Sequence, residues 1–221
     1  MATSPNSNLS LSPGAPANVR IAVLGGQQDV VSDFVFSFLD RPSCVDPNDE
    51  KCLSKSTQIN GQQFNVQVNY TSGQESYRSL QDSYLRQCHG FVCIYDKYKQ
   101  WTLDELLMDY LPKIERVAAS NKEIKTVPLI FFANETDAHA WSSLEELTAK
   151  NKLEAWLKFK PLWVEGNTRT GANVNECVWM LLNQLVKLHY ERELEFQTLS
   201  NKKKLTGKNK KSIKQKKCLI M

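Results

Sequence analysis

The 221 residues are enough for one domain with tails, and a body of about 180 residues would bury roughly 70% of the surface that its unfolded chain exposes. Residues 201–221 hold nine lysines and no acidic residue, so positions 1–200 carry a net charge of −5 against +9 for the tail. This asymmetry predicts a basic tail that seeks an anionic partner, and it argues against a basic nucleic-acid-binding face on the domain.

The six cysteines include no C-x-x-C pair and have no histidine nearby at metal-ligand spacing, so neither a disulfide framework nor a zinc site is expected. Residues 1–17 have no basic start and no apolar run, and nowhere do eighteen apolar residues follow one another. We therefore expect no signal peptide and no transmembrane helix, and a cytosolic protein in a reducing compartment unless another feature anchors it.

Residues 19–70 show the pattern of a strand, a turn, a helix and a hairpin. An apolar run at 19–24 precedes a Gly-Gly turn, and helical periodicity then continues to Leu39. The segments 56–59 and 64–70 flank the dipeptide Asn60-Gly61, which predicts two antiparallel strands joined by a tight turn.

Three further apolar runs, at 90–95, 127–133 and 162–164, alternate with segments of helical periodicity. The predicted helices span 103–119, where Pro112 should kink or restart the helix, then 142–157, and 174 to about 199. Five parallel strands, one antiparallel edge strand and intervening helices predict an open, doubly wound α/β sheet. The expected organisation is a disordered leader at 1–18, a domain at 19–200 and a polybasic tail at 201–221.

The first strand-to-helix turn is the place where such a sheet would bind phosphate, because the helix N-terminus presents free N–H groups. Here the turn matches the phosphate-loop pattern Gly-x-x-x-x-Gly-Lys-Ser/Thr only at Gly25 and Ser32. Val30 stands where a second glycine lets the backbone approach phosphate, and Val31 stands where a lysine neutralises it. On this motif alone, an ordinary strand-to-helix turn is an equal alternative.

A stronger pattern follows the third strand: the run Tyr70-Thr71-Ser72-Gly73-Gln74-Glu75, with Tyr77, Tyr84, Arg86 and Gly90-Phe91 at fixed spacing. It resembles the switch II segment of Ras proteins, whose run is Asp-Thr-Ala-Gly-Gln-Glu, and the resemblance covers roughly residues 19–199. It implies a P-loop NTPase-like small GTPase fold, with a six-stranded mostly parallel sheet and helices on both faces. Tyr70 replaces the acid that reaches magnesium through water, while Gln74 keeps the position that orients the attacking water.

Two further family motifs are present in altered form. The run 134–137 corresponds to Asn-Lys-x-Asp, in which Asp137 would accept hydrogen bonds from guanine and Asn134 would brace the loop. Glu135 cannot supply the stem and charge of the family lysine. In the last motif, Thr168 replaces the small alanine that lets a backbone N–H meet the base.

Counting back from Gly61 places Asn48 where the family has the threonine that senses the γ-phosphate and magnesium. Ser32 alone would hold magnesium only weakly. Losing the loop lysine and the magnesium acid removes about 3–6 kcal/mol of charge-assisted hydrogen bonding from triphosphate binding. The expectation for GTP, GDP and magnesium is therefore weak or absent binding.

The last four residues, from Cys218, form a C-a-a-X box ending in Met, which favours a farnesyl group on that cysteine. The preceding lysines, Lys214, Lys216 and Lys217 among them, predict a second membrane signal. Alone, such a run is also typical of nuclear-localisation and nucleic-acid-binding segments. The expected partner is an anionic membrane, with the cytoplasmic face of the plasma membrane as its location, and the sequence names no protein partner.

Three functions remain open. The favoured hypothesis is a membrane-anchored signalling adaptor that binds nucleotide weakly or not at all. The second is a slow GTPase, supported by Ser32, Gln74, Asn134 and Asp137. The third, a nucleic-acid binder, is disfavoured by the C-a-a-X box.

The tryptophans give a further prediction about surfaces. Trp179, with Met180, Leu182 and Leu185 on the final helix, is expected in the core. Trp101 and Trp141, in predicted loops, are expected on an exposed partner surface.

Overall fold

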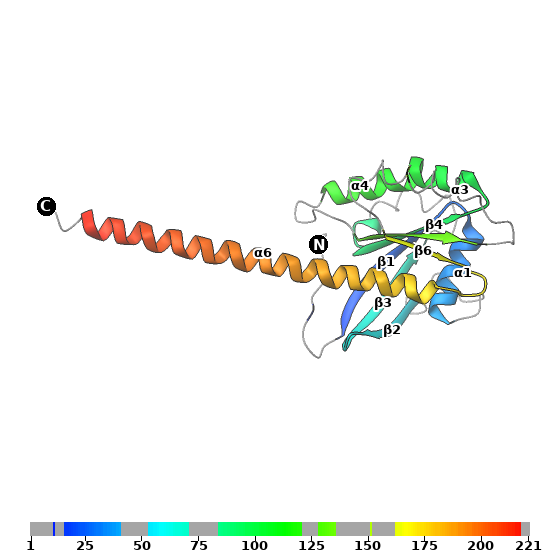
Figure 1. Cartoon of the computed structure of the whole chain (residues 1–221), viewed down its shortest axis with the longest axis horizontal. Coiled ribbons are helices and arrows are strands. Elements are labelled where there is room, and N and C mark those ends of the chain that lie inside the picture. Colours follow the sequence, from blue (N-terminus) through cyan, green and yellow to red (C-terminus); the bar gives the residue numbers. More distant parts are fainter. Residues whose placement is uncertain are drawn as a thin grey trace, which may run out of the picture. The chain divides into compact units, whose positions relative to one another are not determined.

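The computed structural model describes residues 11, 16–40, 53–70, 84–120, 128–135, 151 and 162–217. The chain divides into two units, at residues 1–185 and 186–221. The first unit contains a six-stranded sheet in the order β2-β3-β1-β4-β5-β6 (Figure 1). Only β2 and β3 pair antiparallel, and every other neighbouring pair is parallel. The predicted sheet is thus confirmed.

Four strands follow the apolar runs of the sequence, and the other two flank the Asn60-Gly61 turn. The strands are β1 (Ala17–Leu24), β2 (Ser54–Ile59), β3 (Gln62–Tyr70), β4 (Gly90–Asp96), β5 (Leu129–Asn134) and β6 (Leu162–Gly166). Every residue of β4 and β5 is buried, as expected of central parallel strands that are covered on both faces. Asn60 and Gly61 both have positive φ, 48° and 81°, which is the signature of the predicted two-residue hairpin turn.

The helices cover both faces of the sheet (Figure 1). They are α1 (Gln28–Leu39), α3 (Gln100–Glu105), the π-helical turn η3 (Leu106–Tyr110), α4 (Leu111–Ser120) and α6 (Val174–Lys217). On one face, Phe34 of α1 meets Phe132 of β5 edge-on, with ring centroids 5.0 Å apart. On the other, α3, η3 and α4 bury Leu103, Leu106 and Leu111 against β4 and β5. Adjacent residues such as Phe131 and Phe132 serve opposite faces because side chains alternate along a strand.

The helical run around Pro112 begins at Gln100, passes through a π turn and ends at Ser120. Proline has no N–H to donate, and its ring crowds the carbonyl group four residues earlier, which here belongs to Met108 in η3. A widened turn at that point lets the helix continue through the proline. The interruption predicted at Pro112 is therefore a π turn just before it.

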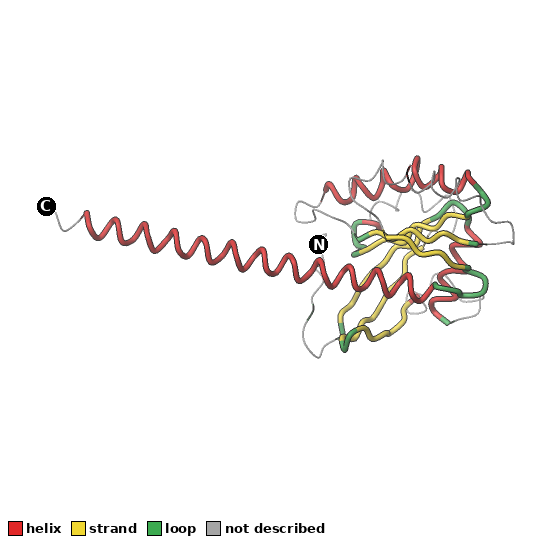
Figure 2. The backbone as a smooth tube through the Cα atoms, viewed as in Figure 1, coloured by secondary structure: helices red, strands yellow, loops and turns green. Residues whose placement is uncertain are grey.

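The final helix is longer than predicted, because α6 continues to Lys217 where the periodicity indicated an end near Leu199. Lysine, glutamine and leucine are good helix formers, and no proline occurs between residues 174 and 217. The part of α6 beyond residue 185 forms the second unit and is drawn as one helix in Figure 2. None of the helices among the described residues has the length and apolar character needed to cross a bilayer.

One prediction about the core is wrong. Trp179 is 44% exposed and Met180 is half-buried, whereas Leu182 and Leu185 are buried as predicted. Residues 178, 181, 182 and 185 share the face of α6 that packs on the sheet, and Trp179 lies about 100° away around the helix. It lines an open groove of about 320 Å³ with Phe38, Lys55 and Ile59, among others. Trp101 is 51% exposed, as predicted, and Trp141 lies outside the described residues.

Candidate functional site

The turn between β1 and α1 lies at the carboxyl end of a central strand, where open α/β sheets bind their ligands. Gly25 is packed tightly: a Cβ atom there would lie 2.8 Å from the Ile94 carbonyl oxygen and 3.0 Å from Cγ2 of Val31. The hydroxyl of Tyr110 donates to the Gly25 carbonyl oxygen over 3.2 Å. The turn is therefore held against β4 and η3 by contacts within the protein.

The two valines of the first turn of α1 belong to the core. Val30 is 4% exposed and Val31 is 1% exposed, so both side chains pack beneath the turn. Position 31 thus supplies apolar packing where the phosphate-loop pattern requires a cation. Ser32 is half-buried on the next position of the helix. Asp29, exposed in the first turn, accepts a hydrogen bond of 3.2 Å from Nε2 of Gln27.

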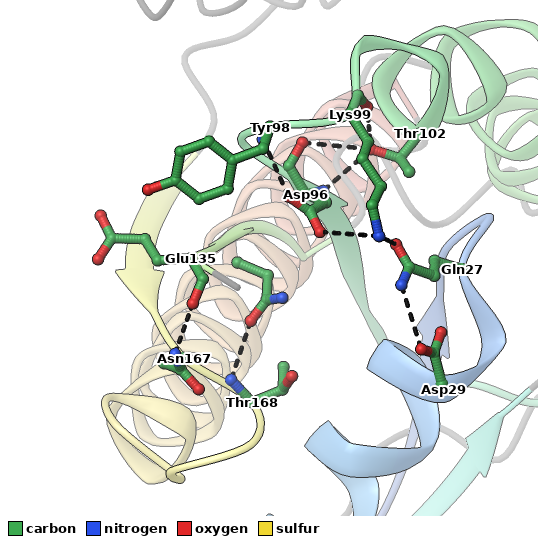
Figure 3. A network of polar contacts seen from close by, with 10 residues as sticks. Gln27, Asp29, Asp96, Tyr98, Lys99, Thr102, Glu135, Asn167 and Thr168 are labelled. Carbon is green, nitrogen blue, oxygen red and sulfur yellow. Dashed lines mark hydrogen bonds and ion pairs between the residues drawn. The ribbon is translucent and has the colours of Figure 1, made fainter. Parts of the chain in front are cut away.

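The loop before α3 and α3 itself bring charged side chains against this turn. Lys99 donates to Oε1 of Gln27 over 2.8 Å, and its ammonium lies 3.7 Å from the carboxylate of the buried Asp96 (Figure 3). The carboxylate of Glu105 fills the space beside Gly26, where a Cβ atom would collide with it. Lys99 is therefore a cation that reaches the turn from outside the phosphate-loop pattern, and it is already engaged by Asp96 and Gln27.

At the other end of the site, Asn134 closes β5 and is fully buried. Its Oδ1 accepts the backbone N–H of Thr168 over 2.9 Å (Figure 3). Its Nδ2 has no hydrogen-bond partner among the described residues. The backbone N–H that the family motif directs at a base is therefore taken up by Asn134, and one buried amide N–H group is left over at the same place.

Glu135 forms part of an ion cluster with Lys97 and Glu165. Nζ of Lys97 lies 2.8 Å from Oε1 of Glu135 and 2.7 Å from Oε2 of Glu165. Burial alone lowers the pKa of Lys97, but the hydrogen bonds and charges of the two glutamates outweigh it, and the pKa is raised above its ordinary value. In Figure 3 the carboxylate of Glu135 points away from Gln27 and the first turn. The acid at the position of the family lysine is thus directed to an internal cation.

Tyr70 is the last residue of β3 and is half-buried. Its ring meets that of Phe36 on α1 edge-on, with centroids 6.3 Å apart. Burial raises the pKa of the Tyr70 phenol above its ordinary value of 10.0, so the group is neutral at physiological pH. A neutral aromatic side chain therefore stands where the resemblance to Ras proteins predicts an acid.

The structure brings the described site residues together in two groups at the carboxyl ends of the strands. Gly25 and Ser32 belong to the turn after β1, whereas Asn134, Glu135 and Thr168 belong to the loops after β5 and β6. The other predicted positions, Asn48, Gln74, Asp137 and Cys218, lie outside the described residues. Lys214, Lys216 and Lys217 lie on α6 in the second unit.

Sequence reasoning missed Asp96, Lys97 and Lys99. A signal was available, because these charges directly follow the apolar run of a central strand, at the edge of the sheet where ligands bind. Around them, the carboxylates of Asp29 and Glu105 stand beside the first turn, and the N–H of Thr168 is engaged by Asn134.

Comparison with known proteins gives one family. A family model described as the Ras family matches residues 41–187, a segment that begins just after α1 and leaves out the turn between β1 and α1. The chain is 25% identical over 219 residues to the Ras-related protein O-RAL of Diplobatis ommata, covering 97% of this chain and 98% of that protein. It is 26% identical over 181 residues to the Ras-related protein ralB-A of Xenopus laevis, covering 79% of each. It is also 26% identical over 170 residues to the Ras-like protein rasB of Dictyostelium discoideum, covering 76% of this chain and 82% of that protein.

Proposed function

The chain belongs to the Ras family, and within that family we propose that it acts as a membrane-anchored signalling adaptor whose partner binding does not depend on nucleotide. The observation that carries the proposal is the burial of Val31, which places an apolar side chain in the core where the phosphate-loop pattern, counted from Gly25, has a lysine. A buried valine offers no compensation for phosphate charge.

The other substitutions act in the same direction. Tyr70 is neutral where the family has the acid that reaches magnesium, and the N–H of Thr168 is used by Asn134. Losing the lysine and the acid costs about 3–6 kcal/mol of charge-assisted hydrogen bonding, which is about two to four powers of ten in affinity. Without these contacts a nucleotide has nothing left that differs between two loop conformations, and a ligand that binds both conformations equally shifts neither population.

The membrane anchor is proposed from the tail. A farnesyl group on Cys218 would give marginal and reversible membrane binding by itself, because one lipid chain supplies only part of the required free energy. The nine lysines of residues 201–221 add up to about 1 kcal/mol each near an anionic surface. Together the two signals fit the cytoplasmic face of the plasma membrane, whose lipids are anionic.

A thermal-shift series tests the proposed function. The purified chain is heated with GTP, GDP or neither, each with and without magnesium, and we expect the same unfolding temperature in all samples. If the dissociation constant for the nucleotide is a thousandth of the added nucleotide concentration, the protein is stabilised by about 4 kcal/mol. For a domain of this size, that raises the unfolding temperature by several degrees. A magnesium-dependent rise of that size with GTP would reject the proposal.

A second candidate function, a slow GTPase, is favoured by two observations. The buried Asn134 has an Nδ2 group without a hydrogen-bond partner among the described residues, and Lys99 brings an ammonium group to the first turn. In that case Lys99 would replace the missing lysine, with Gln74 placing the attacking water. Lys99→Met separates the candidates: it should abolish any nucleotide hydrolysis under the second hypothesis, and under the first there is no hydrolysis to lose.

A further inference from the structure

One lysine connects three neighbouring strands at the end of the sheet where a ligand would bind. Lys97 directly follows β4, and its side chain is 9% exposed. It reaches Glu135, which follows the adjacent strand β5, and Glu165, which lies in the next strand β6, at 2.8 and 2.7 Å. A single buried ammonium group therefore bridges residues that are 38 and 68 positions away in the sequence.

Backbone hydrogen bonds join the same three segments. The N–H of Lys97 donates to the Asn134 carbonyl oxygen over 3.0 Å, and the N–H of Glu135 donates to the Gly166 carbonyl oxygen over 2.8 Å. The N–H of Thr168 donates to Oδ1 of Asn134 over 2.9 Å. These bonds form only while the ends of β4, β5 and β6 lie side by side. The ion pairs of Lys97 connect the same three segments.

We infer that Lys97 is an internal substitute for a ligand, and that its ammonium group holds Glu135 and the turn after β6 in place in the nucleotide-free protein. Open α/β sheets bind their ligands in the crevice at this edge, against the segments that follow the strands. The inference deepens the proposed function, because a nucleotide-independent adaptor needs another means of ordering these segments.

The cluster also accounts for an acid at position 135. An unpaired carboxylate in this loop would stand beside that of Glu165, and the two like charges would push the loops apart. Each glutamate is about half exposed, so either ion pair alone is worth little. The shared lysine is the member whose loss breaks both ion pairs at once.

Hydrogen exchange on the full-length, nucleotide-free chain tests the inference. The reporters are the amides of Glu135 and Thr168, and the reference is the amide of Phe91, which donates to the Pro128 carbonyl oxygen at the opposite end of the same strands. In the unaltered protein we expect the two reporters to be protected to within about tenfold of Phe91. Lys97→Met should lower their protection at least tenfold relative to Phe91.

Two further variants isolate the charge. Lys97→Arg keeps a cation with several donors and should retain most of the protection, while Lys187→Met, at an exposed position of α6, should change nothing. If Lys97→Met lowers the protection of Phe91 as well, because the whole domain opens, Glu135→Gln provides the test. It leaves the pair with Glu165 in place and should reduce the protection of Thr168 several-fold while Phe91 is unaffected.

The inference is overturned if Glu135 and Thr168 exchange at unprotected rates in the unaltered protein, or if neither Lys97→Met nor Glu135→Gln changes their protection relative to Phe91. Nucleotide titration of the same sample keeps this result separate from the proposed function. Protected loops together with tight GTP binding would reject the adaptor and leave the role of Lys97 standing. Unprotected loops without GTP binding would reject only the role of Lys97.

Discussion

Restoring the phosphate-binding residues should exchange stability for nucleotide affinity. The variant carries Val30→Gly, Val31→Lys and Tyr70→Asp. Val30 is 4% exposed within a helix, so its replacement by glycine costs about 2 kcal/mol of lost burial and about 1 kcal/mol of helix propensity. Tyr70→Asp loses the edge contact with Phe36, which is worth about 1 kcal/mol. Without nucleotide the variant should therefore be about 4 kcal/mol less stable than the unaltered chain, before any cost of Val31→Lys.

Bound nucleotide should restore a similar amount. A ligand at a thousand times its dissociation constant stabilises the folded state by about 4 kcal/mol, so GTP with magnesium should raise the stability of the variant by about that amount. Urea denaturation with and without nucleotide measures this difference, and Val30→Gly alone is the matched control that is destabilised but not rescued. A folded triple variant that GTP and magnesium do not stabilise would refute the alignment of Val31 and Tyr70 with the family's phosphate and magnesium positions.

Three other predictions concern the anchor and the ion cluster. Cys218→Ser should release the protein to the cytosol when cell fractions are compared, and equal retention on membranes would exclude this cysteine as the anchor. Glutamine at Lys214, Lys216 and Lys217 together should weaken binding to anionic vesicles, increasingly so at low salt, and leave thermal unfolding unchanged; an unaltered vesicle partition would contradict a polybasic role. Lys97→Met should lower the free energy of unfolding by about 1–2 kcal/mol at pH 7, because its partner carboxylates are half exposed. The folded-state pKa of Lys97 is raised above 10.5, so the difference in unfolding free energy should stay constant between pH 7 and 10 and decrease as the pH rises further. Urea denaturation of both proteins across that pH range measures the difference. If the difference vanishes below pH 9, the charge of Lys97 is excluded as its source.

Four of the strands were predictable because each is a short apolar run, and β3 because its buried and exposed side chains alternate. The hairpin with β2 was predictable because Asn60-Gly61 favours the positive φ angles that the turn adopts. The end of α6 was not, since apolar periodicity stops near Leu199 while helix propensity continues through the lysines. The exposure of Trp179 was missed because a single residue on a helix can lie at the margin of its apolar face.

The site was predictable as a set of substitutions and not as a set of contacts. Family motifs in the sequence indicate which residues at positions 31, 70 and 135 differ, but they do not indicate where the new side chains point. The pairing of Glu135 with Lys97 depends on the order of β4, β5 and β6 in the sheet, which brings together residues far apart in the chain. The burial of Val31 likewise follows from its packing against Gly25 and not from the motif.

The central claim, that this Ras-family protein works without nucleotide control, is tested most directly by calorimetric titration of the unaltered full-length chain with a non-hydrolysable GTP analogue and magnesium. We predict no tight, magnesium-dependent binding, since the lost lysine and acid weaken triphosphate binding by about two to four powers of ten. Tight binding that disappears when magnesium is chelated would contradict the account and establish the protein as a nucleotide-binding GTPase.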